Sequence, residues 1–165
     1  MKNTKIVSAF PCCGKTYYFE NKKDLVVLDS DISNFSWIKD ENGNNTKERN
    51  PEFPNNYIEH IKENIGKVDI IFVSSHKVVR DALSESGLNW SLVIPKKECL
   101  SSWVGRAYMK GSSDGFIKIM IDNWDNWLDE IEKDRMNDLH VNMICYLNHN
   151  EFVSDKEYAW STVRN

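Results

Sequence analysis

Short apolar runs rich in β-branched residues alternate along this chain with segments of helical periodicity. This alternation is typical of βαβ units, in which parallel strands are joined by helices that cover the faces of a sheet. It predicts an α/β fold, a three-layer α/β/α sandwich around a mainly parallel five-stranded sheet. The runs expected to form the strands are residues 5–9, 25–28, 69–73, 91–94 and 142–146.

Three segments between these runs have the periodicity of amphipathic helices. We expect one helix after Pro54, one over about residues 76–86, and the longest over about 113–138. The outer face of the longest helix is acidic, which favours a solvated surface over a partner-binding one. Its apolar stripe consists of Ile117, Met120, Ile121, Trp124, Leu128 and Ile131.

Length and charge limit the class of protein further. At 165 residues the chain is long enough for one domain with a sizeable core, so we expect a single domain over 1–165. A formal net charge of −4 offers no general attraction for polyanions, which makes nucleic acid an unexpected partner. No apolar run has the length of a membrane span, and the four cysteines follow neither a zinc pattern nor a disulfide framework. We therefore expect a cytoplasmic protein with reduced thiols and no membrane contact.

The segment Ala9–Thr16 follows the first expected strand and matches GxxxxGK[ST] except that Ala9 replaces the first Gly. In such a P-loop, consecutive backbone N–H groups surround a phosphate. Lys15 is expected to hold the β and γ oxygens, Thr16 to offer its hydroxyl to Mg²⁺, and Gly14 to admit close backbone approach. The alternative is a plain strand-to-helix turn with Lys15 exposed. The residues expected to bind the nucleotide are Pro11, Cys12, Cys13, Gly14, Lys15 and Thr16.

Cys12 and Cys13 are adjacent thiols beside the expected helix start. The ordinary interpretation is that both residues contribute only backbone N–H groups to the loop. The alternative is a redox switch, because thiols near a helix N-terminus can have lowered pKa values.

Two carboxylates follow the second expected strand, in Leu28-Asp29-Ser30-Asp31. Side chains alternate along an extended chain, so Asp29 and Asp31 are expected to point the same way, at the ligand-binding edge of the sheet. Asp29 is expected on the metal side, and Asp31 could orient or deprotonate an acceptor hydroxyl. The alternative is that Asp29 caps the strand end and Asp31 starts a turn.

The third expected strand ends in Ser74-Ser75-His76, where many P-loop ATPases place an acid. This absence argues against a mechanical or helicase-type ATPase and moves the metal-supporting role to Asp29. His76 either touches substrate or caps the next helix. The polar stretch 36–56 is expected to be a long excursion on the substrate side, as a functional lid or a disordered insertion.

On Ala9–Thr16 and Asp29–Asp31, the chain resembles the small P-loop kinases of the nucleoside and nucleotide kinase-like group, including phage-encoded members. The resemblance implies a P-loop NTPase fold, ATP (or GTP) on the loop with Mg²⁺, and a basic lid over the phosphates. It gives Lys15 and Thr16 the phosphate and metal roles, and it puts Asp29 on the metal side and Asp31 on the acceptor side. For a phage-encoded member it implies the host cytoplasm.

The same resemblance places a short lid at about residues 101–112, where Arg106 could stabilise charge on the transferred phosphoryl group. The alternative for Arg106 is a solvated helix residue. Arg80 and Arg49 are weaker candidates for gripping a substrate phosphate. Phe35 and Trp37 either stack on a base in the acceptor pocket or pack into the core.

The expected function is an ATP- and Mg²⁺-dependent phosphotransferase with Lys15, Asp31 and Arg106 as catalytic residues. Its acceptor is expected to be a small molecule, a nucleoside or nucleoside monophosphate, and a homodimer is an open option. One alternative is a nucleotide-binding interaction protein with little turnover. Another is a polynucleotide 5′-hydroxyl kinase, which needs a basic channel that this acidic chain does not advertise.

Overall fold

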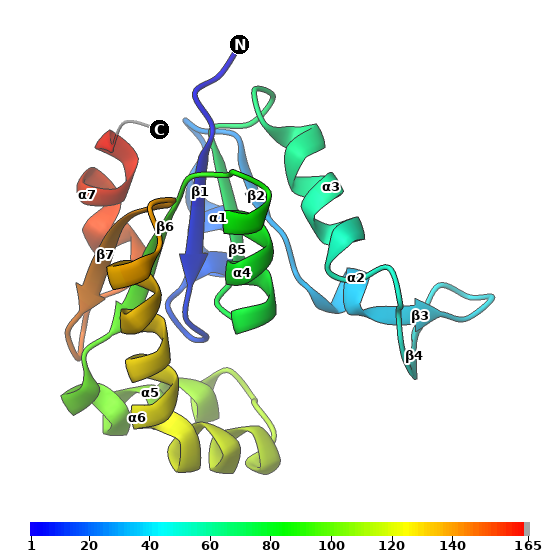
Figure 1. Cartoon of the computed structure of the whole chain (residues 1–165). Coiled ribbons are helices and arrows are strands. Elements are labelled where there is room, and N and C mark those ends of the chain that lie inside the picture. The colour runs from blue at the N-terminus through cyan, green and yellow to red at the C-terminus, as the bar shows by residue number, and fades with distance from the viewer. Residues whose placement is uncertain (164–165) are drawn as a thin grey trace.

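A computed structural model describes residues 1–163. Its main sheet has five parallel strands in the order β2-β5-β1-β6-β7, flanked by helices (Figure 1). The predicted α/β fold with a parallel five-stranded sheet is therefore confirmed. The strands are β1 (Lys5–Ala9), β2 (Val27–Asp29), β5 (Ile70–Ser74), β6 (Trp90–Pro95) and β7 (Val141–Leu147).

Helices cover both faces of this sheet. α1 (Lys15–Asn21) and α7 (Glu157–Thr162) share one face, where Trp160 packs 5.9 Å from Tyr18 and 6.0 Å from Phe72 of β5. The opposite face carries the other three long connections, in the places expected from the sequence (Figure 1). They are α3 (Asn55–Asn64), α4 (Lys77–Glu85) and α6 (Asp114–Asn137).

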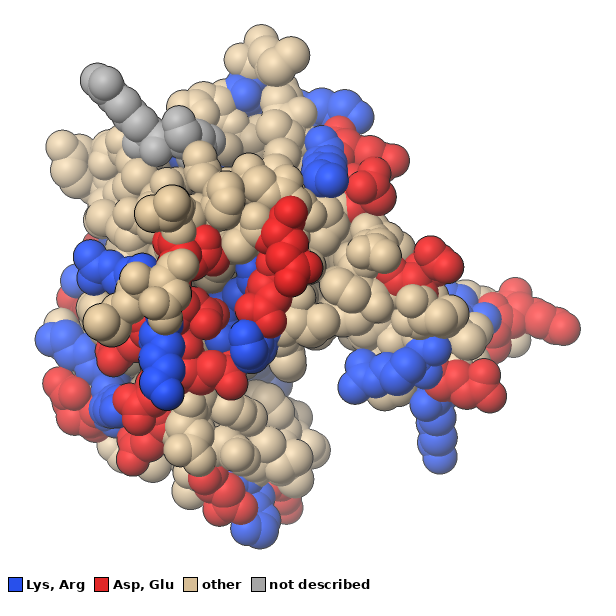
Figure 2. Space-filling model, viewed as in Figure 1, with Lys and Arg blue, Asp and Glu red and all other residues tan. Residues whose placement is uncertain are grey.

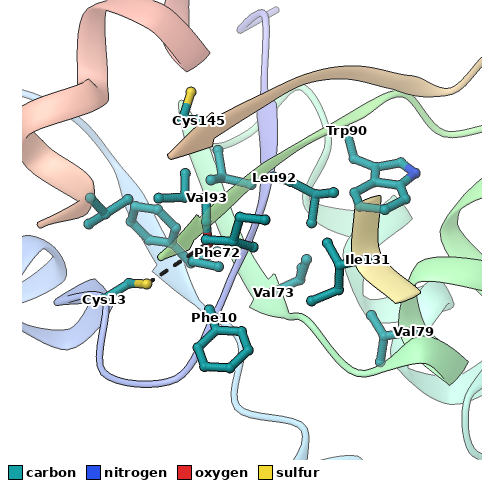
Figure 3. Packing of buried hydrophobic residues seen from close by; sticks show 14 of the residues in the cluster. Phe10, Cys13, Phe72, Val73, Val79, Trp90, Leu92, Val93, Ile131 and Cys145 are labelled. Atoms are coloured by element: carbon teal, nitrogen blue, oxygen red, sulfur yellow. Dashed lines mark hydrogen bonds between the residues drawn. The ribbon is translucent and has the colours of Figure 1, made fainter. Parts of the chain in front are cut away.

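The core lies on both sides of the sheet. The central strands β1, β5 and β6 are buried over nearly their whole length, as expected for parallel strands covered on both faces. Val73, Val79, Leu92 and Ile131 meet between the sheet and the helices α4 and α6 (Figure 3). This packing fixes the carboxyl ends of the strands as a rigid edge.

The excursion expected over 36–56 is ordered, which corrects the alternative of a disordered insertion. It contains an antiparallel hairpin, β3 (Trp37–Lys39) and β4 (Asn45–Arg49), which projects from the body beyond the short helix α2 (Ser33–Ser36) (Figure 1). Asp40 closes the turn, because its Oδ1 accepts from the backbone N–H groups of Asn42 (2.9 Å) and Asn44 (2.8 Å).

The segment expected as a lid is a helix fixed to the body. α5 (Leu100–Met109) follows a 3₁₀ turn at Lys97–Cys99, and its Trp103 is fully buried 6.3 Å from Trp124 of α6. α5 thus forms a wall beside the carboxyl edge of the sheet. Within residues 1–163, none of the helices is long and apolar enough to cross a membrane.

Candidate functional site

A cleft of about 760 Å³ lies at the carboxyl edge of the sheet, above β1. In open α/β sheets, ligands bind at this edge, where the connections leave the sheet in opposite directions. Here β1 leads away towards β2 on one side, and β6 and β7 lie on the other. The cleft is lined by the whole segment 11–17, by 29–32, by Ser74 and His76, and by Arg106, Met109, Lys110 and Phe152.

The loop between β1 and α1 has the backbone shape of an anion-binding nest. Cys12 (φ 63°) and Gly14 (φ 87°) are left-handed, and residues of alternating hand turn successive N–H groups toward one concavity. Ala9 is still in β1, opposite Ser74 and Val93, so its backbone is extended and a methyl group fits without strain. The replacement of the first Gly of the motif therefore leaves the loop intact.

The carbonyl oxygens of three consecutive loop residues each accept a hydrogen bond from a distant part of the chain. These hydrogen bonds fix the direction of each peptide group, so that the N–H at its other end points away from the donor that holds the carbonyl oxygen. The hydrogen bonds are Trp103 Nε1 to Pro11 O (2.9 Å), Arg106 Nη1 to Cys12 O (3.1 Å) and Val153 N to Cys13 O (2.8 Å).

The backbone N–H groups of residues 12–17 find no acceptor anywhere in the described part of the chain. A helix start leaves four such donors, and α1 has no side-chain cap, but the row here begins earlier, at Cys12. Because α1 has only seven residues, the features here that suit an anion are this row of amides and the nearby cations, not the helix dipole.

Lys15 folds back over the loop, with Nζ 3.4 Å from the carbonyl oxygen of Ala9. Burial lowers the pKa of Lys15, and the nearby Asp29 carboxylate opposes this shift. The alternative of an exposed lysine on a plain turn is thus not what the structure has. Lys15 lies in the wall of the cleft, where its charge is available to a bound anion.

Thr16 and Asp29 come together across the cleft, since Thr16 Oγ1 donates to Asp29 Oδ2 at 3.2 Å. Hydroxyl and carboxylate oxygens are hard ligands of the kind that Mg²⁺ takes alongside substrate phosphates and water. Neighbouring ligands of an octahedral Mg²⁺ lie about 2.9 Å apart, so this pair fits the ion without large movement. The described residues contain no group of three or more His, Cys, Asp or Glu with metal-site geometry, so any ion here needs ligand oxygens as well.

Asp31, Ser74 and His76 line another part of the cleft. Asp31 also forms the turn foreseen as its alternative role, because its Oδ1 accepts from Ser33 N at 2.8 Å. His76 Nδ1 lies 2.5 Å from Ser74 Oγ, at the start of α4. Burial lowers the pKa of His76, and the charges of Lys15, Arg80 and Arg49 lower it further, so the imidazole is neutral at neutral pH.

The thiols beside the loop do not have the properties of a redox switch. Burial raises the pKa of Cys12, although Lys110, Arg106 and Lys15 act against the rise. It raises the pKa of Cys13 to about 12, and Figure 3 shows that thiol pointing at the Val93 carbonyl within the core. These raised pKa values are opposite to the lowered ones that the redox interpretation needs, so they favour the interpretation in which both residues contribute only backbone N–H groups.

Arg106 is neither a solvated residue nor a free lid arginine. Its guanidinium lies 3.9 Å from the ring centroid of Trp103 and 4.1 Å from that of Phe152. Besides the bond to Cys12, its Nη2 donates to the carbonyl oxygens of His149 (3.0 Å) and Glu151 (2.6 Å). In this geometry Arg106 holds the loop in place instead of reaching forward to a transferred group.

Three residues expected on the acceptor side lie outside this cleft. Phe35 packs against Tyr57 (5.1 Å) and His60 (4.8 Å), which corresponds to its core-packing alternative. Trp37 stacks under Arg49 in the hairpin, at 4.0 Å. Arg80 is buried at 2% exposure and is paired with carboxylates of α6.

Two residues that the sequence did not single out line the cleft as well. Lys110 ends α5 and adds a third cation beside Lys15 and Arg106. Phe152 covers Gly14 so closely that a Cβ there would lie 2.9 Å from its ring. The sequence signal for Lys110 was its place in the segment 101–112, expected as a basic lid, whereas nothing local marked Phe152.

Comparison with protein-family models, with curated proteins and with solved structures found no match to this chain. What defines its class is therefore its own geometry. It is an α/β protein with a parallel five-stranded sheet and a cleft lined by backbone amides, cations and two carboxylates at the sheet's carboxyl edge.

Proposed function

We propose that this protein is a P-loop phosphotransferase that moves the terminal phosphoryl group of ATP (or GTP) to a small acceptor, a nucleoside or nucleotide. The observation that carries the proposal is the row of backbone N–H groups over residues 12–17. These groups have no acceptor among residues 1–163, while the loop carbonyl oxygens are already hydrogen-bonded to Trp103, Arg106 and Val153. Such a row complements the oxygens of a phosphate chain.

The side chains around this row divide the work of binding. Lys15 contacts the terminal phosphate oxygens, and Lys110, which also lines the cleft, adds positive charge. Thr16 and Asp29 hold Mg²⁺, which, when bound, offsets the negative charge that the phosphates carry. Catalysis then consists of alignment and of charge stabilisation in a fixed environment.

The acceptor enters on the side of Asp31 and His76. Its oxygen forms a bond to the terminal phosphorus as the bond from that phosphorus to the bridging oxygen breaks, and the nucleoside diphosphate leaves. Where the acceptor is a hydroxyl, its proton passes to the Asp31 carboxylate. Arg106 contributes indirectly, as a positioning residue that keeps the Cys12 peptide in place.

The test is the formation of ADP by purified protein with ATP, Mg²⁺ and a panel of nucleosides and nucleoside monophosphates. Lys15→Met should lower the rate about 10²- to 10³-fold, as does loss of one preorganised charge-stabilising group elsewhere. Lys118→Met is the matched control, because Lys118 is exposed on α6 and pairs only with Asp122 in the described structure. Equal rates for the wild type and Lys15→Met, or no acceptor-dependent ADP at all, would refute the proposal.

A second candidate is a nucleotide-binding interaction protein with little turnover. The commitment of Arg106 to three carbonyl groups favours it, since no arginine of α5 is left to stabilise the transferred group. Stoichiometric binding of ATP with no ADP formed in a single-turnover experiment would select this candidate.

A polynucleotide 5′-hydroxyl kinase gains no support from the surface. On the face shown in Figure 2, Lys and Arg lie among Asp and Glu instead of forming a basic stripe. Labelling of oligonucleotide 5′ ends would nevertheless reveal that activity directly, and we expect none.

A further inference from the structure

A second pocket of about 220 Å³ adjoins the cleft and shares Pro11 and His76 with it. It lies between the start of α4 and the inner face of α6. Whole small-molecule ligands fill about 300–1,000 Å³, so this pocket has room for one ring and not for a nucleotide. Its position beside His76 puts it on the acceptor side of the proposed transfer.

Three aromatic side chains wall this pocket. Phe10 is fully buried, and its ring centroid lies 6.3 Å from that of Trp127 of α6. Phe116, one turn into α6, is only partly buried and completes the set. Flat apolar walls of this kind favour a planar ring over an aliphatic chain.

A buried cation supplies the polar contact. Arg80 is 2% exposed, and its Nε and Nη2 donate to Asp134 (2.5 Å) and Glu130 (3.0 Å), while its Nη1 donates to the carbonyl oxygen of Ser75. A guanidinium has five N–H donors, so within the described structure two of the five remain without an acceptor. A ligand beside Arg80 is therefore expected to offer acceptors, such as ring carbonyl oxygens.

We infer that this pocket receives the base of the acceptor, and that it takes a single-ring nucleobase with a keto group at the edge facing Arg80. The ring lies among Phe10, Phe116 and Trp127 with its carbonyl edge toward Arg80. The sugar then passes the rim formed by Pro11 and His76, and its hydroxyl or phosphate faces the cleft. A base that presents an amino group at the same edge places a hydrogen-bond donor against the N–H donors of Arg80, so it binds more weakly.

This inference rests on the proposed phosphotransferase function, but its test does not depend on turnover. Binding of uridine, cytidine, guanosine and adenosine to the protein is measured by titration calorimetry without ATP, and ATP binding is measured separately. We expect uridine to bind at least about tenfold more tightly than cytidine, and guanosine and adenosine, whose two-ring bases exceed the room in the pocket, to bind more weakly than uridine. ATP affinity is a property of the loop and should not follow this order.

Phe116→Ala tests the ring contact, and Ile119→Ala is its control on the same helix, because Ile119 is 53% exposed and lies outside both pockets. Loss of one base–aromatic contact should weaken nucleoside binding about tenfold in Phe116→Ala and leave ATP binding and the Ile119→Ala variant unchanged. Equal binding of all four nucleosides, or no effect of Phe116→Ala, would overturn the inference. Failure of the proposed function would appear differently, as absence of ATP binding or of ADP formation.

Discussion

Replacing Gly14 by Ala tests the geometry of the loop in a way that can be worked out from the structure. Gly14 has φ of 87°, and a left-handed residue with a Cβ costs about 1–2 kcal/mol. The new Cβ would also lie 2.9 Å from Phe152 Cδ1 and 3.5 Å from its Cγ, which forces the ring to move. Overpacking of this kind costs about 1–3 kcal/mol, so Gly14→Ala should lower the free energy of unfolding by about 2–5 kcal/mol.

The two costs can be separated by a double-mutant cycle with Phe152→Ala. Removing the ring relieves the close contact, because only the Cβ of residue 152 remains, 3.4 Å away, while the backbone strain at residue 14 stays. In the Phe152→Ala background, Gly14→Ala should therefore cost only about 1–2 kcal/mol. The loss of the Arg106 stacking contact is the same in both Phe152 variants and cancels in the cycle.

The assay is urea unfolding of the four proteins, followed by circular dichroism, with the midpoints compared at equal m-values. A coupling of about 1–3 kcal/mol between positions 14 and 152 is expected. If Gly14→Ala costs the same in both backgrounds, Phe152 does not cover the loop and this description of the site is wrong. If the substitution costs nothing in either, residue 14 is not left-handed in solution.

Three further measurements test other parts of the site. Followed by NMR, His76 should titrate below its ordinary pKa of 6.5, and Lys15→Met should raise the titration midpoint. Because the pKa is lowered in the folded state, protonation of His76 reduces the stability of the fold as the pH falls from 6.5 through the folded value. A midpoint at or above 6.5 would contradict this expectation. Arg80→Ala should lower the free energy of unfolding by about 3 kcal/mol, the lower end for breaking a buried ion pair, because Glu130 is 45% exposed. The control Arg135→Ala, on the exposed side of α6, should lower it by less than about 0.5 kcal/mol. Equal losses in the two variants would exclude a buried network. N-ethylmaleimide at pH 8 should leave Cys13 unmodified in the native protein and label it after unfolding, and rapid native labelling would show that the thiol is not buried.

Much of the sheet was predictable because its signal is local. The runs at 5–9 and 69–73 are apolar on both faces, which only a covered parallel strand tolerates, and both are strands in the structure. The hairpin over 37–49 was missed because its residues are polar and it projects from the core. Its turn, with Asn42 and Gly43 between the strands, was the available signal.

In the candidate site, too, some contacts could be predicted from local sequence and others could not. Thr16 and Asp29 could be expected to meet, since the carboxyl ends of parallel strands share one edge, and they lie in hydrogen-bond contact. The bond from Arg106 to Cys12 spans 94 residues and depends on how α5 packs, which no local pattern encodes. The same holds for Phe152, whose contact with Gly14 follows from the path of the chain after β7.

These long-range contacts support the proposal that an acidic chain presents a site for phosphate groups. A peptide group in a free loop can turn over and offer its carbonyl oxygen to a phosphate, which repels it. Here Trp103, Arg106 and the Val153 N–H each hold one carbonyl on the far side, so the amides need no rearrangement when an anion arrives. In the proposed function, these three groups therefore aid binding by holding the loop in shape, because the loop is ordered before the ligand arrives. By this reasoning α5, which was expected from the sequence to be a movable lid, supports the proposed site as a fixed helix that holds the loop in its binding conformation.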